Sequence, residues 1–181
     1  ACIADALAMP VHWYYDTAAL ARDYGRVQDY VRPKNPHPDS ILWRSRYRPV
    51  RPQADILHSQ ARFWGQRGIH YHQFLEAGEN TLNLKLSRLL MDSLIAREEY
   101  DQQDYLDRYV AFMTTPGTHN DTYVEECHRE FFQAWAPHKK GPPARLPDEK
   151  HIGGLSLALP LLLFYQDRWD TALHLAEAHL A

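Results

Sequence analysis

The clearest hydrophobic pattern in the chain lies between Glu79 and Arg97, where leucines recur at every fourth residue. The apolar stripe consists of Leu82, Leu86, Leu90 and Leu94, and it is widened by Leu89 and Met91. Spacings of three and four residues place these side chains on one face of an α-helix. The pattern therefore predicts a helix over residues 79–97 that packs at the centre of the core.

Five weaker patterns predict further helices. An apolar helix around Ala4 must end at Pro10, because proline lacks the N–H group that a continuing helix needs. Asp16 and Gly25 are residue types that cap and stop a helix, so a short helix is expected between them. Further helices are expected over residues 103–114, from residue 120 or 121 to residue 135, and over residues 168–180.

The segments between these helices have a different composition. Residues 26–53 hold five prolines among several arginines, which predicts a long loop with a strand pair around residues 41–47. Arginine binds phosphate well, but a solvated loop is the more common role of such a segment. Residues 54–64 are expected to be helical, residues 69–74 to be extended, and residues 139–148 to form a loop.

One C-terminal segment, residues 152–165, is apolar on every side. We expect it to be helical, buried all round and kinked at Pro160. Its longest apolar run, residues 155–165, is shorter than the roughly 20 residues that a membrane-spanning helix needs, so no membrane partner is expected. Together these patterns predict an all-α fold in a single domain over residues 1–181.

Composition narrows the class of protein. The 181 residues are 45% hydrophobic and 24% charged, which is ordinary for a globular protein, and the net charge of −3 argues against a nucleic-acid partner. Cys2 and Cys127 do not make a disulfide framework, so a reducing, cytoplasmic location is expected. The sequence starts within one apolar pattern and stops within another, so we expect a fragment whose C-terminal part is missing.

The eleven histidines include two patterns that could carry chemistry. His70 and His72 alternate along an extended segment, which can place two imidazoles on one metal ion, but no further ligand follows at a fixed spacing. A surface or hydrogen-bonded histidine pair is therefore preferred. Glu125 and His128 have the Glu-x-x-His spacing of helical di-iron carboxylate proteins. His128 shares its face with apolar residues, so we favour a core histidine and keep a metal–carboxylate protein as a third alternative.

Several strings resemble motifs of one known family. The opening string, Asp-Ala-Leu-Ala-Met-Pro-Val-His-Trp at residues 5–13, is similar to the opening motif of ADP-ribosylglycohydrolases. The string Gly-Glu-Asn-Thr-Leu-Asn at residues 78–83 stands where that family has a Thr-Asp-Asp-Thr metal motif. Residues 119–132 and 150–155 resemble strings of the branch that includes the J1 crystallins.

The resemblance covers essentially the whole chain and implies the orthogonal multi-helical fold of that family. It also implies hydrolysis of an ADP-ribosyl bond, with Mg²⁺ as the cofactor and ADP-ribose or an ADP-ribosylated substrate as the partner. It assigns catalytic roles to Asp5 and His12 and metal contacts to Thr81 and Asn83. The ligand-binding residues that it implies are Asp121, His151, Gly153 and Gly154.

The metal motif departs from the family pattern. Thr81 retains the first threonine, but Leu82 and Asn83 replace the two aspartates and Leu84 replaces the last threonine. Leucine cannot ligate Mg²⁺, and a neutral amide is a weaker ligand than a carboxylate for a hard cation. His12 stands where hydrolytic members have an acid, and imidazole acts as a base but binds hard metals poorly. The family's second aspartate motif would lie beyond the last residue.

Two functions from different classes follow from these matches and departures. The first is a hydrolase that cleaves an N- or O-glycosidic ADP-ribosyl bond, in which His12 or Asp5 activates water. The second is a catalytically inactive relative that binds ADP-ribose or has a structural role, as the crystallins of that branch do. The order of motifs along the chain favours the hydrolase, whereas Leu82 in the metal motif favours the inactive relative.

Overall fold

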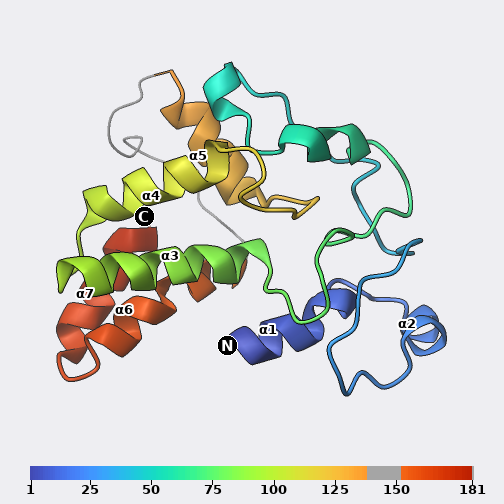
Figure 1. Ribbon diagram of the computed structural model, residues 1–181, viewed down its shortest axis with the longest axis horizontal. Coiled ribbons are helices and arrows are strands. Elements are labelled where there is room, and N and C mark those ends of the chain that lie inside the picture. The colour runs from blue at the N-terminus through green and yellow to red at the C-terminus, as the bar shows by residue number, and fades with distance from the viewer. Residues whose placement is uncertain (138–151, 181) are drawn as a thin grey trace.

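The computed structural model describes residues 1–137 and 152–180, and every regular element in these ranges is helical (Figure 1). The α-helices are α1 (Cys2–Ala8), α2 (Thr17–Asp23), α3 (Leu82–Arg97), α4 (Gln102–Thr114), α5 (Glu126–Trp135), α6 (Leu159–Phe164) and α7 (Trp169–Leu180). Short 3-10 helices are η1 (Met9–Val11), η2 (Pro52–Ala54), η3 (His58–Phe63) and η4 (Ile152–Ala158). The prediction of an all-α fold is confirmed for the described residues.

Helix α3 is central to the helical packing. It contacts α4, α6 and η4, and α7 packs against α6 and η4 (Figure 1). Leu86 and Leu90, from the predicted leucine stripe, are completely buried. The four-leucine stripe is thus confirmed as a core face, whereas Met91, which was expected to widen it, has 43% of its surface exposed. The helix begins at Leu82 because Thr81 has an extended backbone conformation as its N-cap.

The predicted ends of the first two helices are confirmed. Helix α1 stops at Ala8, and Pro10 lies in the tighter turn η1 that follows. In α2 the Asp16 side chain accepts a hydrogen bond from the backbone N–H of Ala19 at 2.9 Å, and Gly25 follows with a φ of +61°. These ends were predictable because a cap and a proline act within one turn of their own position.

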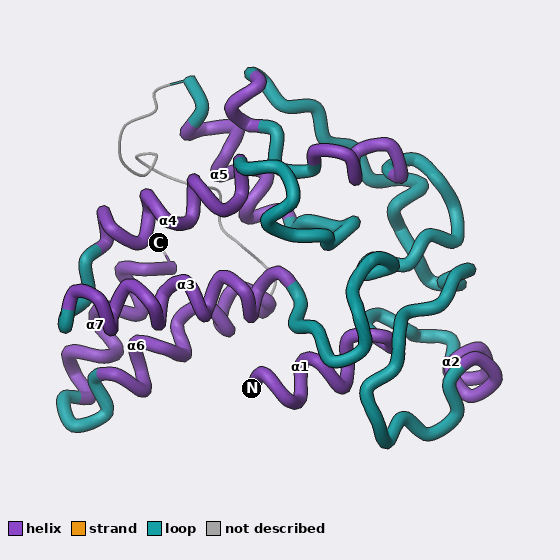
Figure 2. Tube along the Cα trace, in the orientation of Figure 1, coloured by secondary structure: helices purple, strands orange, loops and turns teal. Residues whose placement is uncertain are grey.

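Loops and turns gather on the side of the molecule that holds α1 and α2 (Figure 2). The predicted strand pair around residues 41–47 is wrong, because the N–H groups of Arg44 and Ser45 both bond back to the Ile41 carbonyl and close a turn. Residues 71–74 also form a turn, which the alternating pattern of residues 69–74 did not predict. In the turn at residues 41–45 the Leu42 side chain is completely buried, and this apolar contact holds the turn in place.

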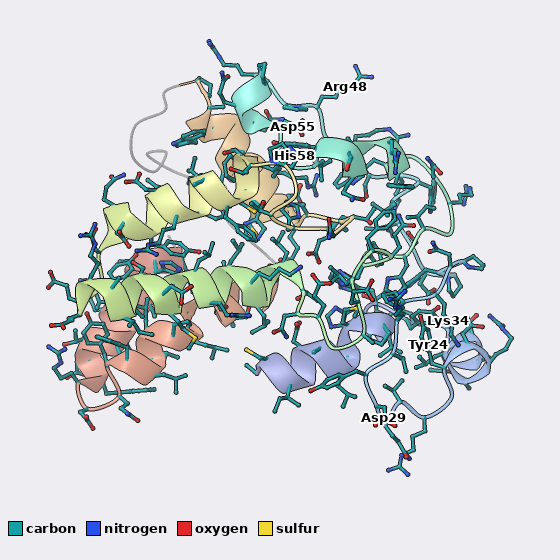
Figure 3. The ribbon with its side chains drawn as sticks, in the orientation of Figure 1. Tyr24, Asp29, Lys34, Arg48, Asp55 and His58 are labelled. Carbon is teal, nitrogen blue, oxygen red and sulfur yellow. The ribbon has the colours of Figure 1, made fainter. Side chains whose placement is uncertain are left out.

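Residues 54–64, which were expected to be one helix, contain the last residue of η2 and the 3-10 helix η3. Asp55 lies before η3 and close to His58, its first residue (Figure 3), and the Asp55 carboxylate accepts the N–H groups of Leu57 at 3.2 Å and His58 at 2.9 Å. The carboxylate therefore supplies the bonds that a preceding helical turn would otherwise make. Arg48 is exposed and projects outward (Figure 3), as expected for a solvated loop.

The tip of the loop after α2 is tied back to that helix. Lys34 and Tyr24 lie side by side (Figure 3), with the Lys34 ammonium group 5.0 Å from the centre of the Tyr24 ring. The same ammonium group donates to the Asp23 carbonyl at 2.6 Å. A cation over an aromatic ring is attracted to its π face, so the pair closes the loop onto α2.

The C-terminal apolar segment is less buried than predicted. It divides into η4 and α6, with Pro160 in the first turn of α6. Leu155 and Leu163 have 56% and 66% of their surface exposed, so the expectation of burial on all sides is wrong. Within the described ranges, no helix combines the length and the apolar character needed to cross a membrane. The predicted loop at residues 139–148 lies outside the described residues.

Candidate functional site

A pocket of about 250 Å³ lies where the end of η1, the start of α3 and the segment before α5 meet. Its lining includes five of the residues singled out in the sequence: Asp5, His12, Thr81, Asn83 and Asp121. These residues are up to 116 positions apart in the chain (121 minus 5), so the fold brings them together. Concave sites that collect polar side chains in this way are the usual location of ligand binding.

Asp5 holds the loop that leads into α3. Its carboxylate accepts hydrogen bonds from the Thr81 N–H and hydroxyl groups, both at 2.8 Å, and from the Asn80 side chain at 3.0 Å. Helix α1 presents Asp5 to this loop, and the Thr81 hydroxyl faces the carboxylate instead of capping its own helix. The contacts give Asp5 the task of fixing the start of α3 at the pocket.

A chain of three side chains ends at the pocket. The Asp121 carboxylate lies 2.9 Å from His72 Nδ1, and His72 Nε2 lies 3.1 Å from His12 Nδ1. Asp121 is completely buried and His72 is 3% exposed. All three line the pocket, and their order is a buried acid, a buried histidine and a half-buried histidine.

The hydrogen bonds among Asp121, His72 and His12 determine which ring nitrogens carry a proton. An ionised carboxylate only accepts, so His72 donates from Nδ1 to Asp121. A neutral His72 then accepts at Nε2, and His12 must donate to it from Nδ1. The unprotonated nitrogen of His12 is consequently Nε2. His12 Nε2 makes no hydrogen bond within the part of the chain that the structure describes. Among the described residues, His119 Nδ1 is the one side-chain N or O atom that is fully buried and lacks a partner. His12 Nε2 is therefore not fully buried, and it is accessible from the pocket.

Burial and neighbouring groups determine the charge states of His12 and Asp121. Burial, reinforced by the neighbouring His72, lowers the pKa of His12 to about 4, so His12 is neutral at pH 7. Burial opposes ionisation of Asp121, but the hydrogen bond from His72 and the charge of Lys85 outweigh it and lower the pKa of Asp121. The chain thus pairs a permanent negative charge with a neutral base at the pocket.

Asp121 is held from a second side by α3. Lys85 lies 3.3 Å from one carboxylate oxygen of Asp121 and 2.8 Å from Glu79, and the N–H group of Leu82 donates to the other oxygen at 3.3 Å. This explains why α5 begins at Glu126 and not at residue 120 or 121 as predicted. The Asp121 side chain is used in these long-range contacts and does not cap a helix.

The segment expected to bind Mg²⁺ has other contacts. The Thr81 hydroxyl donates to Asp5, and the Asn83 amide donates to Glu125 at 3.2 Å and lies 3.4 Å from His128 Nε2 through its oxygen. Leu82 and Leu84 have no ligating atoms in their side chains. Mg²⁺ requires an octahedral set of oxygen ligands, so residues 81–84 do not fit this ion.

Aromatic rings form part of the pocket wall. Trp13 has a φ of +57°, which is rare for a residue with a side chain, and its ring stacks on His72 at 5.7 Å. Tyr123 contacts Trp13 edge-on at 5.8 Å and stacks on Trp64. Trp13 and Tyr123 both line the pocket and offer flat apolar surfaces to a ligand.

The remaining predicted residues are less informative. His151 lies outside the described residues, and Gly153 and Gly154 belong to η4. A Cβ atom at Gly154 would meet no other atom within 4 Å, so its surroundings do not require glycine. Sequence reasoning missed His72, Trp13 and Tyr123 as parts of the site. The alternation of His70 and His72 was the available signal. Of its two preferred interpretations, the hydrogen-bonded pair is confirmed, since the backbone N–H of His72 donates to His70 Nδ1 at 3.0 Å, and the surface pair is wrong, since both histidines are buried.

Comparison with known proteins gives one match. The family model described as ADP-ribosylglycohydrolase matches residues 1–181. No curated protein and no solved structure matches the chain. The match covers the pocket and the histidine chain together with the helical core.

Proposed function

The chain belongs to the ADP-ribosylglycohydrolase family, and we propose that it hydrolyses an ADP-ribosyl linkage, N- or O-glycosidic, in the pocket that His12 lines. The observation that carries the proposal is the hydrogen-bonded order from Asp121 through His72 to His12. This order leaves an unprotonated imidazole nitrogen at the pocket, which is what activation of a water molecule requires. The substrate is an ADP-ribosylated molecule, and the product is ADP-ribose.

The proposed reaction is a displacement by water at the anomeric carbon of the ribose. His12 Nε2 takes a proton from the attacking water as the new C–O bond forms. The bond to the acceptor breaks, its electrons leave with the acceptor atom, and that atom takes a proton from solvent. His72 and Asp121 are positioning residues, because their hydrogen bonds fix the His12 tautomer, and the negative charge of Asp121 favours the imidazolium that forms. No step is assigned to residues 81–84.

The decisive test is the loss of the base. We expect His12→Gln to reduce kcat/KM for release of ADP-ribose from an ADP-ribosylated protein by about 10²- to 10⁴-fold, the usual contribution of general-base catalysis. His174→Gln on the exposed face of α7 is the matched control and should retain activity. Full activity of His12→Gln would remove the assignment of the base, and absence of ADP-ribose release by the wild-type protein would remove the hydrolase itself.

The second candidate function is an inactive relative that binds ADP-ribose or has a structural role. It is favoured by one observation, namely that the side chains of Thr81 and Asn83 bond to protein groups and the two leucines beside them cannot ligate. Calorimetric titration with ADP-ribose separates the cases. Binding that is indifferent to Mg²⁺, without turnover, supports a reader of ADP-ribose, whereas no binding by the folded protein supports a structural role.

Finer relationships are part of the same proposal. The strings at residues 119–132 and 150–155 support placement in the branch that includes the J1 crystallins. We treat residues 1–181 as one domain, because the family match runs over all of them. Cys2 and Cys127 are not joined in a disulfide bond, which supports a reducing, cytoplasmic location.

A further inference from the structure

A cluster of three different ligating side chains lies at the start of α5. Glu125 is the N-cap of this helix, and Cys127 and His128 belong to its first turn. One carboxylate oxygen, the thiol sulfur and one imidazole nitrogen all lie within 4.8 Å of one another. This separation is close to that of ligand atoms around one metal ion, so small side-chain rotations suffice for all three to reach it.

The imidazole of this cluster is held as metal-bound imidazoles are. His128 is 3% exposed, and its Nδ1 lies 2.8 Å from the Tyr109 hydroxyl of α4. In the tautomer in which Nδ1 donates to the Tyr109 hydroxyl, Nε2 is the ring nitrogen that would face a metal ion. Nε2 lies 3.4 Å from the Asn83 amide oxygen, so a metal ion on Nε2 would take the place of that contact. A fixed partner on one ring nitrogen orients the other for a metal.

The donor set selects the class of metal. We propose that Glu125, Cys127 and His128 bind a divalent transition metal of the zinc type. Thiolate and imidazole are ligands that such ions prefer and that Mg²⁺ does not. Carboxylate and thiolate together carry two negative charges, which balance one divalent ion. A three-residue set also leaves a coordination position for water.

This site differs from two of the metal sites considered from the sequence. It does not use residues 81–84, which lack the required oxygen ligands. It is also not a di-iron carboxylate site, because such a site needs a Glu-x-x-His pair from each of two helices, and the comparable pair on α7, His174 and Glu177, has the reverse order and is exposed. Glu125 and Asn83 line the pocket that His12 lines, so the metal would sit at the edge of that pocket. The proposal does not depend on hydrolysis of ADP-ribosyl bonds.

The test measures metal directly and needs no activity. The whole protein is dialysed separately against Zn²⁺, Co²⁺ and Mg²⁺, and bound metal is quantified by mass spectrometry. We expect one Zn²⁺ or Co²⁺ per chain, no Mg²⁺, and a sulfur-to-cobalt charge-transfer band in the Co²⁺ form. Cys127→Ser and Glu125→Gln should each weaken metal binding at least about tenfold, whereas the exposed Cys2→Ser is the matched control and should not.

A second measurement uses the wild-type protein, so it holds even if a variant fails to fold. A thiol reagent is added with and without Zn²⁺, and the labelled cysteine is identified by peptide mass spectrometry. Zn²⁺ should slow labelling of Cys127 by tenfold or more and leave Cys2, which is exposed, unchanged. The proposal is overturned if Cys127 is labelled equally in both conditions, if no transition metal binds, or if Cys127→Ser binds it as tightly as the wild type.

Discussion

Different forces hold two regions of this molecule together. In the helical region, formed by α3, α4, α6 and α7, buried apolar side chains such as Leu86 and Leu90 form the core. In the loop region, residues 24–81, buried polar side chains bond to backbone groups far away in sequence. Apolar burial has no preferred direction and does not depend on pH. These hydrogen bonds are directional, and those made by histidine depend on pH. The two regions should therefore fail under different conditions.

Two histidines illustrate how the loop region is built. His37 accepts the N–H group of Asp39 at Nδ1 and donates from Nε2 to the His12 carbonyl at 2.9 Å. His70 accepts the N–H group of His72 and donates to the Pro10 carbonyl at 2.9 Å. Only the neutral imidazole can make both bonds, because protonation would place a hydrogen on Nδ1 against a backbone N–H. Both side chains are completely buried.

The largest expected difference between the regions is in acid. Burial lowers the pKa of His70 to about 3 and also lowers the pKa of His37. Below about pH 6.5 the two histidines bind protons in the unfolded chain but not in the folded protein. The free energy of unfolding therefore falls as pH falls from about 6.5 toward the folded pKa. The loss is about 1.4 kcal/mol per pH unit for each histidine. Denaturant unfolding between pH 7.5 and 5 measures it, and a flat profile would contradict this account of the loop region.

A cavity in the helical region should lower the free energy of unfolding by a large amount that does not depend on pH. Leu86 is completely buried in α3, so Leu86→Ala removes its packing and leaves a void. We expect it to lower the free energy of unfolding by about 3 kcal/mol, and by the same amount at pH 7.5 and pH 5. Met91→Ala, on the exposed part of the same helix, is the control. A pH-dependent effect of Leu86→Ala would mean that the two regions are not separate in this sense.

Removal of a single hydroxyl group in the loop region should lower the free energy of unfolding by a smaller amount. Tyr71 is 3% exposed, and its hydroxyl accepts the N–H group of Ile41 at 2.8 Å. Tyr71→Phe keeps the ring and leaves that N–H group without its partner, so we expect a loss of about 1 to 2 kcal/mol. Tyr15→Phe, at an exposed tyrosine, should change stability by much less. Equal effects of the two substitutions, measured by urea unfolding, would rule out the proposed role of the Tyr71 hydroxyl.

The smallest predicted effects compare a cap in the helical region with the cap of α2, the helix that precedes the loop region. Asp101 caps α4 through the Asp104 N–H group at 3.0 Å, and Asp16 caps α2 through Ala19. Replacing either aspartate by alanine should cost about 1 kcal/mol. Hydrogen exchange should show the Asp16→Ala loss within α2 alone, since Ala19 is the one buried residue of that short helix. Loss of protection across the helical region in Asp16→Ala would show that the regions unfold together.

The sequence predicted the helical region well, because its signals are local. The spacing of the leucines from Leu82 to Leu94 places them on one face, and Pro10 and Asp16 set helix ends within a turn of themselves. In the loop region the long loop over residues 26–53 was predicted, but its turns and long-range contacts were not, for the opposite reason. The contact between His70 and Pro10 joins residues 60 positions apart, and no local pattern encodes it.

The site was predictable only in part. The opening motif indicated Asp5 and His12, and both line the pocket. The role of His72 was not visible, because it depends on partners 60 positions before it and 49 positions after it. The motif also suggested metal contacts at Thr81 and Asn83, whereas their side chains bond to neighbouring protein groups. A motif identifies which residues gather, and the contacts of each residue decide what it does.

The stacking of Trp13 on His72 gives the pocket an optical reporter. The indole lies 5.7 Å from the His72 ring and 5.6 Å from the His12 ring, so its excited state is sensitive to charge on either imidazole. A protonated imidazole against an indole quenches its emission, and a bound ring displaces the water around it. The difference in fluorescence between the wild type and Trp13→Phe is therefore a spectroscopic record of protons and ligands arriving beside His12.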